Sequence, residues 1–221
     1  MDRQKIRAVV FDLDGTLLDT AQDIGAGANQ ALRRSGFPEH SRQDYIGYIG
    51  HGIRELLRMA CPEDCGEEAY ENVVKDYLAY YPEHCTELTV PFPGIMDMMK
   101  RLQEAGYVLG ILSNKTEGTT LRIIRYFFPG TPFRVIWGNN GVRPLKPALD
   151  AGYLLMEELG MERENIMYVG DGESDMEFAS KMGFTAVAAT WGYRPREQLI
   201  ENGAEVLLNS AEDLLKLLDL Q

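Results

Sequence analysis

Short apolar runs alternate along the chain with longer stretches in which apolar residues recur at helical spacing. The runs that we predict to be strands are residues 6–11, 107–112, 134–137, 166–169 and 185–189. Residues 6–11 and 166–169 are almost continuously apolar, which is typical of strands buried on both faces of a parallel sheet. Between the runs lie amphipathic stretches, such as the one that places Ile95, Met98 and Leu102 on one helix face. The alternation predicts an α/β fold, a Rossmann-like parallel sheet flanked by helices.

Two further helices are predicted from the same pattern. One carries Leu154, Leu155 and Leu159 on one face and ends at Gly160, because glycine favours the residue after a helix C-terminus. The other spans residues 211–218 and follows Ser210, whose hydroxyl suits an N-cap. Both helices are expected to cover the sheet.

Residues 19–85 break the alternation, because they hold helical periodicity and no buried strand. The predicted helix faces are Ile24, Ala28, Ala31 and Leu32; Ile53, Leu56, Leu57 and Ala60; and Val73, Tyr77, Leu78 and Tyr81. So long a helical segment exceeds an ordinary crossover between two strands. We therefore predict an α/β core domain of residues 1–18 and 86–221 and an inserted small α-helical cap domain of residues 19–85. Such a cap, hinged at residues 18–20 and 82–93, can exclude water and select the substrate.

Composition narrows the class of protein. The 34 acidic residues outnumber the 22 lysines and arginines, which gives a net charge of −12 without a compensating basic block. This charge argues against nucleic acid and anionic membranes as partners. It still allows a phosphorylated substrate, because a bound Mg²⁺ and a few basic side chains can reverse the local field.

The sequence also gives expectations for the cellular location of the protein and for the role of its cysteines. The first apolar stretch ends at Asp12, too early for a signal peptide, and no run reaches the roughly 18 residues of a membrane span. We expect a cytoplasmic protein, either monomer or homodimer. Three cysteines suggest no disulfide framework, and Cys61, Cys65 and the pair His84–Cys85 fit no usual zinc spacing, so ordinary thiols are expected.

Acidic residues lie just past two of the predicted strands. Asp12 and Asp14 stand in the sequence DLDGT, and Asp171 and Asp175 stand in GDGESD. Ligands bind at the carboxyl ends of parallel strands, so these carboxylates are expected to share one crevice. They would repel one another without a cation, and Mg²⁺ is a hard, oxygen-seeking candidate. Taken singly, DLDG also suits a turn, and Asp175 also suits a helix cap.

Two more sets of polar residues accompany the acids. Ser113, Asn114 and Lys115 follow the second predicted strand and offer a hydroxyl and backbone amides, although a helix cap with a solvated lysine is the alternative. Lys146, before Pro147, has no acidic neighbour in the sequence and by itself would be an ordinary surface lysine.

The order and strand-end placement of these four sets resemble the haloacid dehalogenase-like phosphohydrolase superfamily. The resemblance covers essentially the whole chain and is closest to the phosphoglycolate phosphatase-like branch. The matching segments are residues 12–20, 113–115, 146–147 and 170–175. Gly172 stands where this branch often has serine, which leaves Glu173 and Ser174 as alternatives for a hydrogen bond near the metal. Leu149 stands where the family often has a second proline after the Lys-Pro pair.

The resemblance implies a role for each core residue. Asp12 would be the nucleophile that forms an aspartyl-phosphate, and Asp14 would be the general acid and base. Mg²⁺ would bind the Asp12 carboxylate, the Asp14 backbone carbonyl and Asp171, with Asp175 in support.

The resemblance also implies a phosphate site and a specificity loop. Ser113, the Asn114 amide and Lys146 would hold the phosphoryl group. Gly50, His51 and Arg54 lie in a segment that resembles the specificity loop of the branch, and His51 and Arg54 could contact an anionic or polar leaving group. The alternative is a glycine-rich turn with a solvated Arg54.

Together these observations predict a Mg²⁺-dependent phosphatase that acts on a small phosphorylated metabolite, with a phosphoglycolate-like substrate favoured. The alternatives on the same scaffold are a beta-phosphoglucomutase-like sugar phosphomutase, a nucleotidase and a pyrophosphatase. Lys75, the only lysine of the cap, lies deep in a helical stretch, so phosphonate cleavage through a cap lysine is disfavoured. The acid at position 14 disfavours a dehalogenase or a transport-ATPase domain. A non-catalytic phosphate-sensing module is disfavoured because every reacting residue is present.

Overall fold

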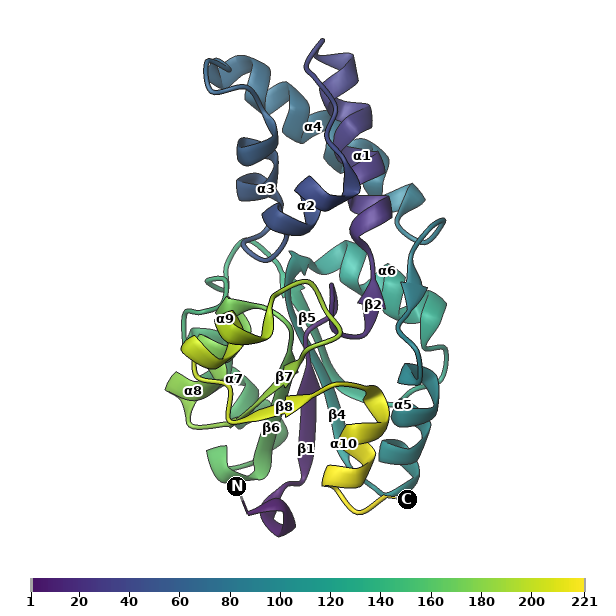
Figure 1. Ribbon diagram of the computed structural model, residues 1–221, viewed down its shortest axis with the longest axis vertical. Coiled ribbons are helices and arrows are strands. Elements are labelled where there is room, and N and C mark those ends of the chain that lie inside the picture. Colours follow the sequence, from purple (N-terminus) through teal and green to yellow (C-terminus); the bar gives the residue numbers. More distant parts are fainter. Residues whose placement is uncertain (1, 221) are drawn as a thin grey trace.

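A six-stranded parallel sheet forms the centre of the protein, which is described here by a computed structural model for residues 2–220. Its strand order is β5-β4-β1-β6-β7-β8 (Figure 1). The strands are β1 (Ala8–Phe11), β4 (Val108–Thr116), β5 (Phe133–Asn139), β6 (Ile166–Gly170), β7 (Thr185–Ala189) and β8 (Val206–Leu208). The predicted Rossmann-like α/β architecture is confirmed.

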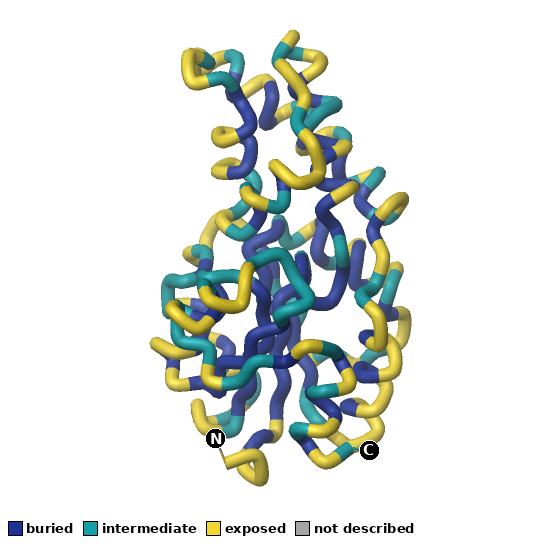
Figure 2. Tube along the Cα trace, in the orientation of Figure 1, coloured by how far each residue is buried: buried dark blue, intermediate teal, exposed yellow. Residues whose placement is uncertain are grey.

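Helices cover both faces of the sheet. Val9 and Phe11 of β1 pack with α5 (Ile95–Glu104), α6 (Glu117–Phe127) and α10 (Ala211–Leu217). The alternate residues Ala8 and Val10 pack on the other face, with α7 (Asp150–Leu159), α8 (Glu173–Met182) and α9 (Arg196–Glu201). Because side chains of a strand alternate between faces, β1 must be apolar throughout, and it is fully buried at the centre of the molecule (Figure 2).

Four helices stand above the carboxyl ends of the strands (Figure 1). They are α1 (Ala21–Arg34), α2 (Arg42–Tyr48), α3 (Ile53–Ala60) and α4 (Glu67–His84). A two-residue antiparallel ribbon, β2 (Leu18–Asp19) with β3 (Val90–Pro91), joins them to the sheet. The domain boundaries at residues 18/19 and 85/86 stay a prediction, but the exit does not begin at Pro82, because α4 continues to His84.

Most of the predicted helix faces are buried, with two corrections. The α1 face is buried as predicted, and so is the α5 face that carries Ile95. The prediction that Leu78 is buried is wrong, because this residue lies at the edge of the α4 face with 45% of its surface exposed. Val74 is buried instead. Leu154 is also 45% exposed, because α7 buries Ala151 and Leu155 against the sheet.

Strand bounds differ from the predicted ones where polar residues continue a strand. The strand predicted to end at residue 112 is β4, which continues to Thr116, where it pairs with Asn139. The short strands β2, β3 and β8 are not predicted, since two or three residues are too few to show a period. Among residues 2–220, no helix combines the length and the apolar character that crossing a membrane requires.

Candidate active site

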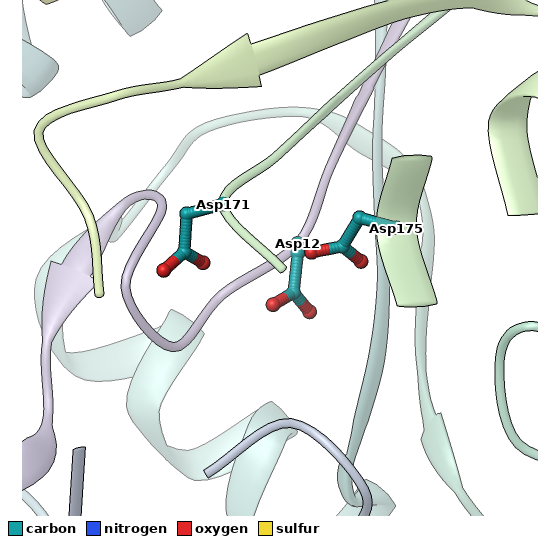
Figure 3. Close-up of side chains that lie close together, drawn as sticks. All are labelled: Asp12, Asp171 and Asp175. Atoms are coloured by element: carbon teal, nitrogen blue, oxygen red, sulfur yellow. The ribbon is translucent and has the colours of Figure 1, made fainter. Parts of the chain in front are cut away.

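Three aspartates meet at the carboxyl end of the sheet centre. Asp12 follows β1, Asp171 follows β6, and Asp175 lies in the first turn of α8. Each offers a carboxylate oxygen, and these atoms lie within 4.8 Å of one another (Figure 3). The meeting follows from register, because Phe11 pairs with Val169, and Asp12 comes directly after Phe11 while Asp171 comes two residues after Val169. All three residues are buried.

The turn after Asp14 fits closely around Asp171. Gly15 has a φ of +83°, and a Cβ built on it would lie 2.2 Å from the Asp171 Oδ2 atom. Thr16 Oγ1 donates a hydrogen bond to Asp171 Oδ1 at 3.1 Å. Only glycine can therefore occupy position 15 while Asp171 keeps this place.

Lys146 joins two of the aspartates. Its buried Nζ atom donates to Asp12 Oδ1 at 3.0 Å, to Asp175 Oδ1 at 2.6 Å and to the Tyr168 hydroxyl at 2.7 Å. Burial alone would lower the pKa of Lys146, but the charges of Asp12 and Asp175 outweigh burial and raise it. Lys146 is therefore a cation held among acids, although it has no acidic neighbour in the sequence.

The acidic group suits a hard divalent cation. Burial raises the pKa of Asp171 well above its usual range, and the charge of Asp175 adds to this effect. Burial also raises the pKa of Asp175, against the opposing charge of Lys146. Three buried carboxylates share one ammonium and offer only oxygen ligands, which is the donor set that Mg²⁺ prefers.

Asp14 is not part of this group and has partners of its own. Its carboxylate accepts hydrogen bonds from Lys115 Nζ at 3.0 and 3.1 Å and from Thr20 Oγ1 at 2.7 Å. Lys115 Nζ also lies 4.8 Å from the centre of the Tyr81 ring. No role was predicted for Lys115. Its place directly after Ser113 and Asn114, two predicted phosphate ligands, could have indicated that it lies in the site.

The predicted phosphate ligands line the same cavity. Ser113, Asn114 and Lys146 are buried in its floor. The Asn114 side chain accepts from the Lys146 backbone N–H at 2.8 Å and donates to the Gly50 carbonyl at 2.9 Å. This amide therefore links β4 both to the loop of Lys146 and to the connection between α2 and α3.

Of the three predicted specificity residues, one lines the cavity and two do not. The cavity lies between the sheet and the helical segment above it, and Gly50 lines it. His51 and Arg54 are exposed and do not line it, and Arg54 pairs with Glu71 at 2.6 Å. The structure thus places Arg54 on the outer surface, as in the alternative of a glycine-rich turn.

The helical side of the cavity is mainly apolar. Its largest lining side chains are Ile24, Ile49, Ile53, Leu56, Tyr77 and Tyr81. Burial, with a contribution from Tyr77, raises the pKa of Tyr81 well above its usual range, so its hydroxyl stays protonated.

A loop after β7 connects Asp171 with the helices, which the sequence analysis missed. The Tyr193 backbone N–H donates to Asp171 Oδ2 at 2.7 Å, and its hydroxyl accepts from the backbone N–H of Thr20 and Ala21. Next to it, Arg194 donates to the backbone carbonyls of Ile46, Gly47 and Ile49, at the end of α2 and just after it. The only signal in the sequence is an aromatic residue and an arginine shortly after a strand.

Arg194 engages Glu173, one of the two alternatives for a hydrogen bond near the metal, and the choice between Glu173 and Ser174 stays a prediction. Its Nε atom donates to Glu173 Oε2 at 2.9 Å, while its guanidinium reaches the carbonyls of Ile46 at 2.6 Å and Ile49 at 2.5 Å. Glu173 is therefore occupied by Arg194, and Ser174 is the one of the two that lines the cavity beside the aspartates.

Cysteines form no alternative metal site in the part of the chain that the structure describes. Cys61 and Cys85 are buried free thiols, and Cys65 is a half-buried one. Among residues 2–220, the three aspartates are the only group of three or more potential ligands close enough to share an ion.

Comparison with known proteins agrees with this geometry. The family model described as haloacid dehalogenase-like hydrolase matches residues 9–189. A protein of Aquifex aeolicus named phosphoglycolate phosphatase is 32% identical over 214 residues, which cover 97% of both chains. A protein of Pseudomonas aeruginosa named N-acetylmuramic acid 6-phosphate phosphatase is 29% identical and covers 99% of this chain and 97% of its own.

A solved structure extends the likeness to three dimensions. The crystal structure of a putative phosphoglycolate phosphatase from Lactobacillus delbrueckii subsp. bulgaricus superposes with a TM-score of 0.87 at 29% identity. The match covers 96% of this chain and 98% of that one. The sheet and the helices therefore share their arrangement with that structure.

Proposed function

This chain belongs to the haloacid dehalogenase-like hydrolase family, and we propose that it is a Mg²⁺-dependent phosphatase working through an aspartyl-phosphate on Asp12. It is a phosphoric monoester hydrolase, and its relatives act on small phosphorylated substrates. The observation that carries the proposal is the placement of Asp12. Its Oδ1 atom accepts a hydrogen bond from Lys146, and its carboxylate lies close to those of Asp171 and Asp175.

Asp12 is placed to attack phosphorus. Lys146 bonds its Oδ1 atom, and no donor among residues 2–220 bonds its Oδ2 atom, which leaves that oxygen available. In the first step an Asp12 oxygen would form a bond to phosphorus while the bond from phosphorus to the leaving oxygen breaks. Asp14 would give its proton to the leaving oxygen.

The second step would return both aspartates to their starting state. The ionised Asp14 would take a proton from a water molecule as that water attacks the phosphorus of the aspartyl-phosphate. The bond between Asp12 and phosphorus then breaks and inorganic phosphate forms. Lys115, 3.0 Å from Asp14, would hold this carboxylate in place between the two proton transfers.

The remaining core residues would bind charge. Asp12, Asp171 and the Asp14 backbone carbonyl would hold the Mg²⁺, whose contribution when bound is to neutralise the phosphoryl oxygens. Asp175 would orient Lys146, which lies 2.6 Å from it. Ser113 and the backbone amide of Asn114 would bind phosphoryl oxygens, since the Asn114 side chain is engaged elsewhere.

The helices α1–α4, within the predicted cap of residues 19–85, would close the site from above. Asn114 and Arg194 support this role, because both bond to backbone carbonyls of the connection that follows α2. Substrate choice would then depend on the helical side. Relatives named for phosphoglycolate and for N-acetylmuramic acid 6-phosphate show that the same scaffold serves leaving groups of different size.

The test is turnover of p-nitrophenyl phosphate by the purified protein, with Mg²⁺ and with excess EDTA. We expect activity that EDTA removes and Mg²⁺ restores. The same assay on phosphoglycolate, sugar phosphates, nucleotides and pyrophosphate separates a phosphatase from the mutase, nucleotidase and pyrophosphatase alternatives. Arg54→Ala is the matched control, because Arg54 pairs with Glu71 outside the cavity and its loss leaves the chemistry intact. Absence of metal-dependent turnover on every substrate would overturn the proposal.

A further inference from the structure

Among residues 2–220, the helical side of the cavity offers no charged side chain to a leaving group. Its side chains are the isoleucines, leucine and tyrosines named above. The arginines of α1–α3 instead pair with acidic residues outside the cavity: Arg33 with Glu39, Arg34 with Asp76, Arg42 with Asp19, Arg54 with Glu71 and Arg58 with Glu67. Lys75 is exposed and does not line the cavity either.

The cations that do line the cavity already have carboxylate partners. Lys146 bonds Asp12 and Asp175, Lys115 bonds Asp14, and Arg194 bonds Glu173. Among the described residues, the cavity therefore holds no cation without an acidic partner. A substrate with a second anionic group would bury that charge against apolar side chains, which is strongly unfavourable.

One polar atom on the helical side lacks a partner. The Tyr81 hydroxyl is buried, and no hydrogen-bond partner lies within reach among residues 2–220. Tyr81 is 2% exposed and lines the cavity. Because buried hydroxyls nearly always have a partner and Tyr81 lines the cavity, this hydroxyl is placed to bond an atom of a ligand there. Its ring lies beside Lys115, which holds Asp14, so a ligand there is next to the proposed general acid.

We propose that the substrate is a phosphomonoester with an uncharged, largely apolar leaving group whose oxygen-bearing part hydrogen-bonds to Tyr81. The inference rests on the proposed phosphatase function and moves the favoured substrate away from phosphoglycolate, whose leaving group carries a carboxylate. Ile24, Ile49, Ile53 and Leu56 would pack against the apolar part.

The first test compares two substrates of the same shape. Isobutyl phosphate and phosphoglycolate differ in that two methyl groups replace two carboxylate oxygens. We expect kcat/KM to be at least about 100-fold higher for isobutyl phosphate, because an unpaired buried charge costs several kcal/mol. If the enzyme that hydrolyses p-nitrophenyl phosphate uses phosphoglycolate equally well or better, the inference is overturned and the proposed function stands. No metal-dependent turnover of any of the three overturns both.

The second test places a charge on the helical side. Ile53 is half-buried and lines the cavity, so Ile53→Lys adds an ammonium there, and Ile53→Gln is the control of similar size and polarity. Ile53→Lys should reduce the preference for isobutyl phosphate at least about tenfold, whereas Ile53→Gln should change it much less. Equal ratios in the two variants would contradict an uncharged pocket as the source of selectivity.

The third test removes the Tyr81 hydroxyl. The probes are 4-hydroxybutyl phosphate and pentyl phosphate, which differ by a hydroxyl in place of a methyl group. In Tyr81→Phe, kcat/KM for the hydroxylated probe should fall about tenfold relative to the alkyl probe. Thermal unfolding checks that the variant folds. An unchanged ratio in a folded variant would remove Tyr81 from the proposal.

Discussion

On the sheet side of the cavity, polar groups are held by hydrogen bonds between residues far apart in the sequence, whereas on the helical side the lining groups are held by packing. Lys146 and Asp12 are 134 residues apart, yet their side chains lie at 3.0 Å. Across the cavity, Ile24 and Leu56 belong to buried apolar faces of α1 and α3. Hydrogen bonds fix direction, and packing fixes mainly shape. Under the proposed function, the sheet side would determine the reaction and the helical side would determine the leaving group.

The largest effect that would distinguish the two sides is expected at Asp12. Asp12→Asn keeps the shape and removes the nucleophilic charge, so activity on every substrate should fall at least about 1,000-fold. Initial rates with p-nitrophenyl phosphate measure the loss, and thermal unfolding confirms that the variant folds. Ile53→Ala, on the helical side, should lower rates far less and unequally between substrates. Substantial activity in Asp12→Asn would exclude Asp12 as the nucleophile.

The next effect concerns stability on the sheet side. Lys146→Met leaves Asp12 and Asp175 buried without their ammonium partner, so the free energy of unfolding should fall by about 3 to 5 kcal/mol. Urea unfolding in EDTA gives the value. Lys181→Met is the control, because Lys181 forms an exposed pair with Glu177 and should contribute about 0.5 kcal/mol or less. Similar losses in both variants would show that the buried network contributes little to stability.

Binding of Mg²⁺ to the aspartates on the sheet side should stabilise the folded protein. At a Mg²⁺ concentration about 100 times its dissociation constant, the gain is about 2.7 kcal/mol. For a chain of this length, Tm should rise by about 5 to 10 °C. Differential scanning fluorimetry with and without Mg²⁺ measures the shift. Asp171→Asn should abolish it, whereas Arg54→Ala should leave it unchanged. A full shift in Asp171→Asn would place the ion elsewhere.

A smaller effect is expected where the two sides are joined. Arg194→Ala removes the donors to the carbonyls of Ile46 and Ile49, so we expect a loss of about 1 to 3 kcal/mol in unfolding free energy and a higher KM. Urea unfolding and steady-state kinetics measure the two effects. Gln198→Ala, which loses one hydrogen bond to the same Glu173, is the control. Unchanged stability and KM in Arg194→Ala would show that this arginine does not hold the helices over the site.

The sheet side could be predicted well from sequence because its signals are local. An apolar run with an aspartate at most two residues after it identifies both the strand and the position of the carboxylate near its end. Register then brings Asp12 and Asp171 together without further information. The partners of Lys146 could be inferred only through a family resemblance, because the contact depends on the fold.

The helical side could not be predicted to the same depth. Helical spacing identified the α1 face correctly but misassigned Leu78 in α4, since a residue at the edge of a face is buried only if a neighbour covers it. The position of Arg54 depends on how the chain turns before α3. Gly50 and Gly52 there have φ values of +127° and +84°, which a pattern of residue types does not specify. The exposed position of Arg54 follows from that turn.

The ribbon of β2 and β3 has a consequence for how such a protein can change over evolution. Leu18 pairs with Pro91 and Asp19 with Val90, so residues 20–89 leave the sheet and return to it at adjacent points. For the rest of the chain, this segment is a loop closed by the ribbon, and the free-energy cost of closing a flexible loop rises by only about 0.6 kcal/mol for each doubling of its length. Insertions, deletions or exchange of the whole segment can thus be tolerated while the strands keep their register. A lineage could in this way acquire new substrates with its reaction centre unaltered.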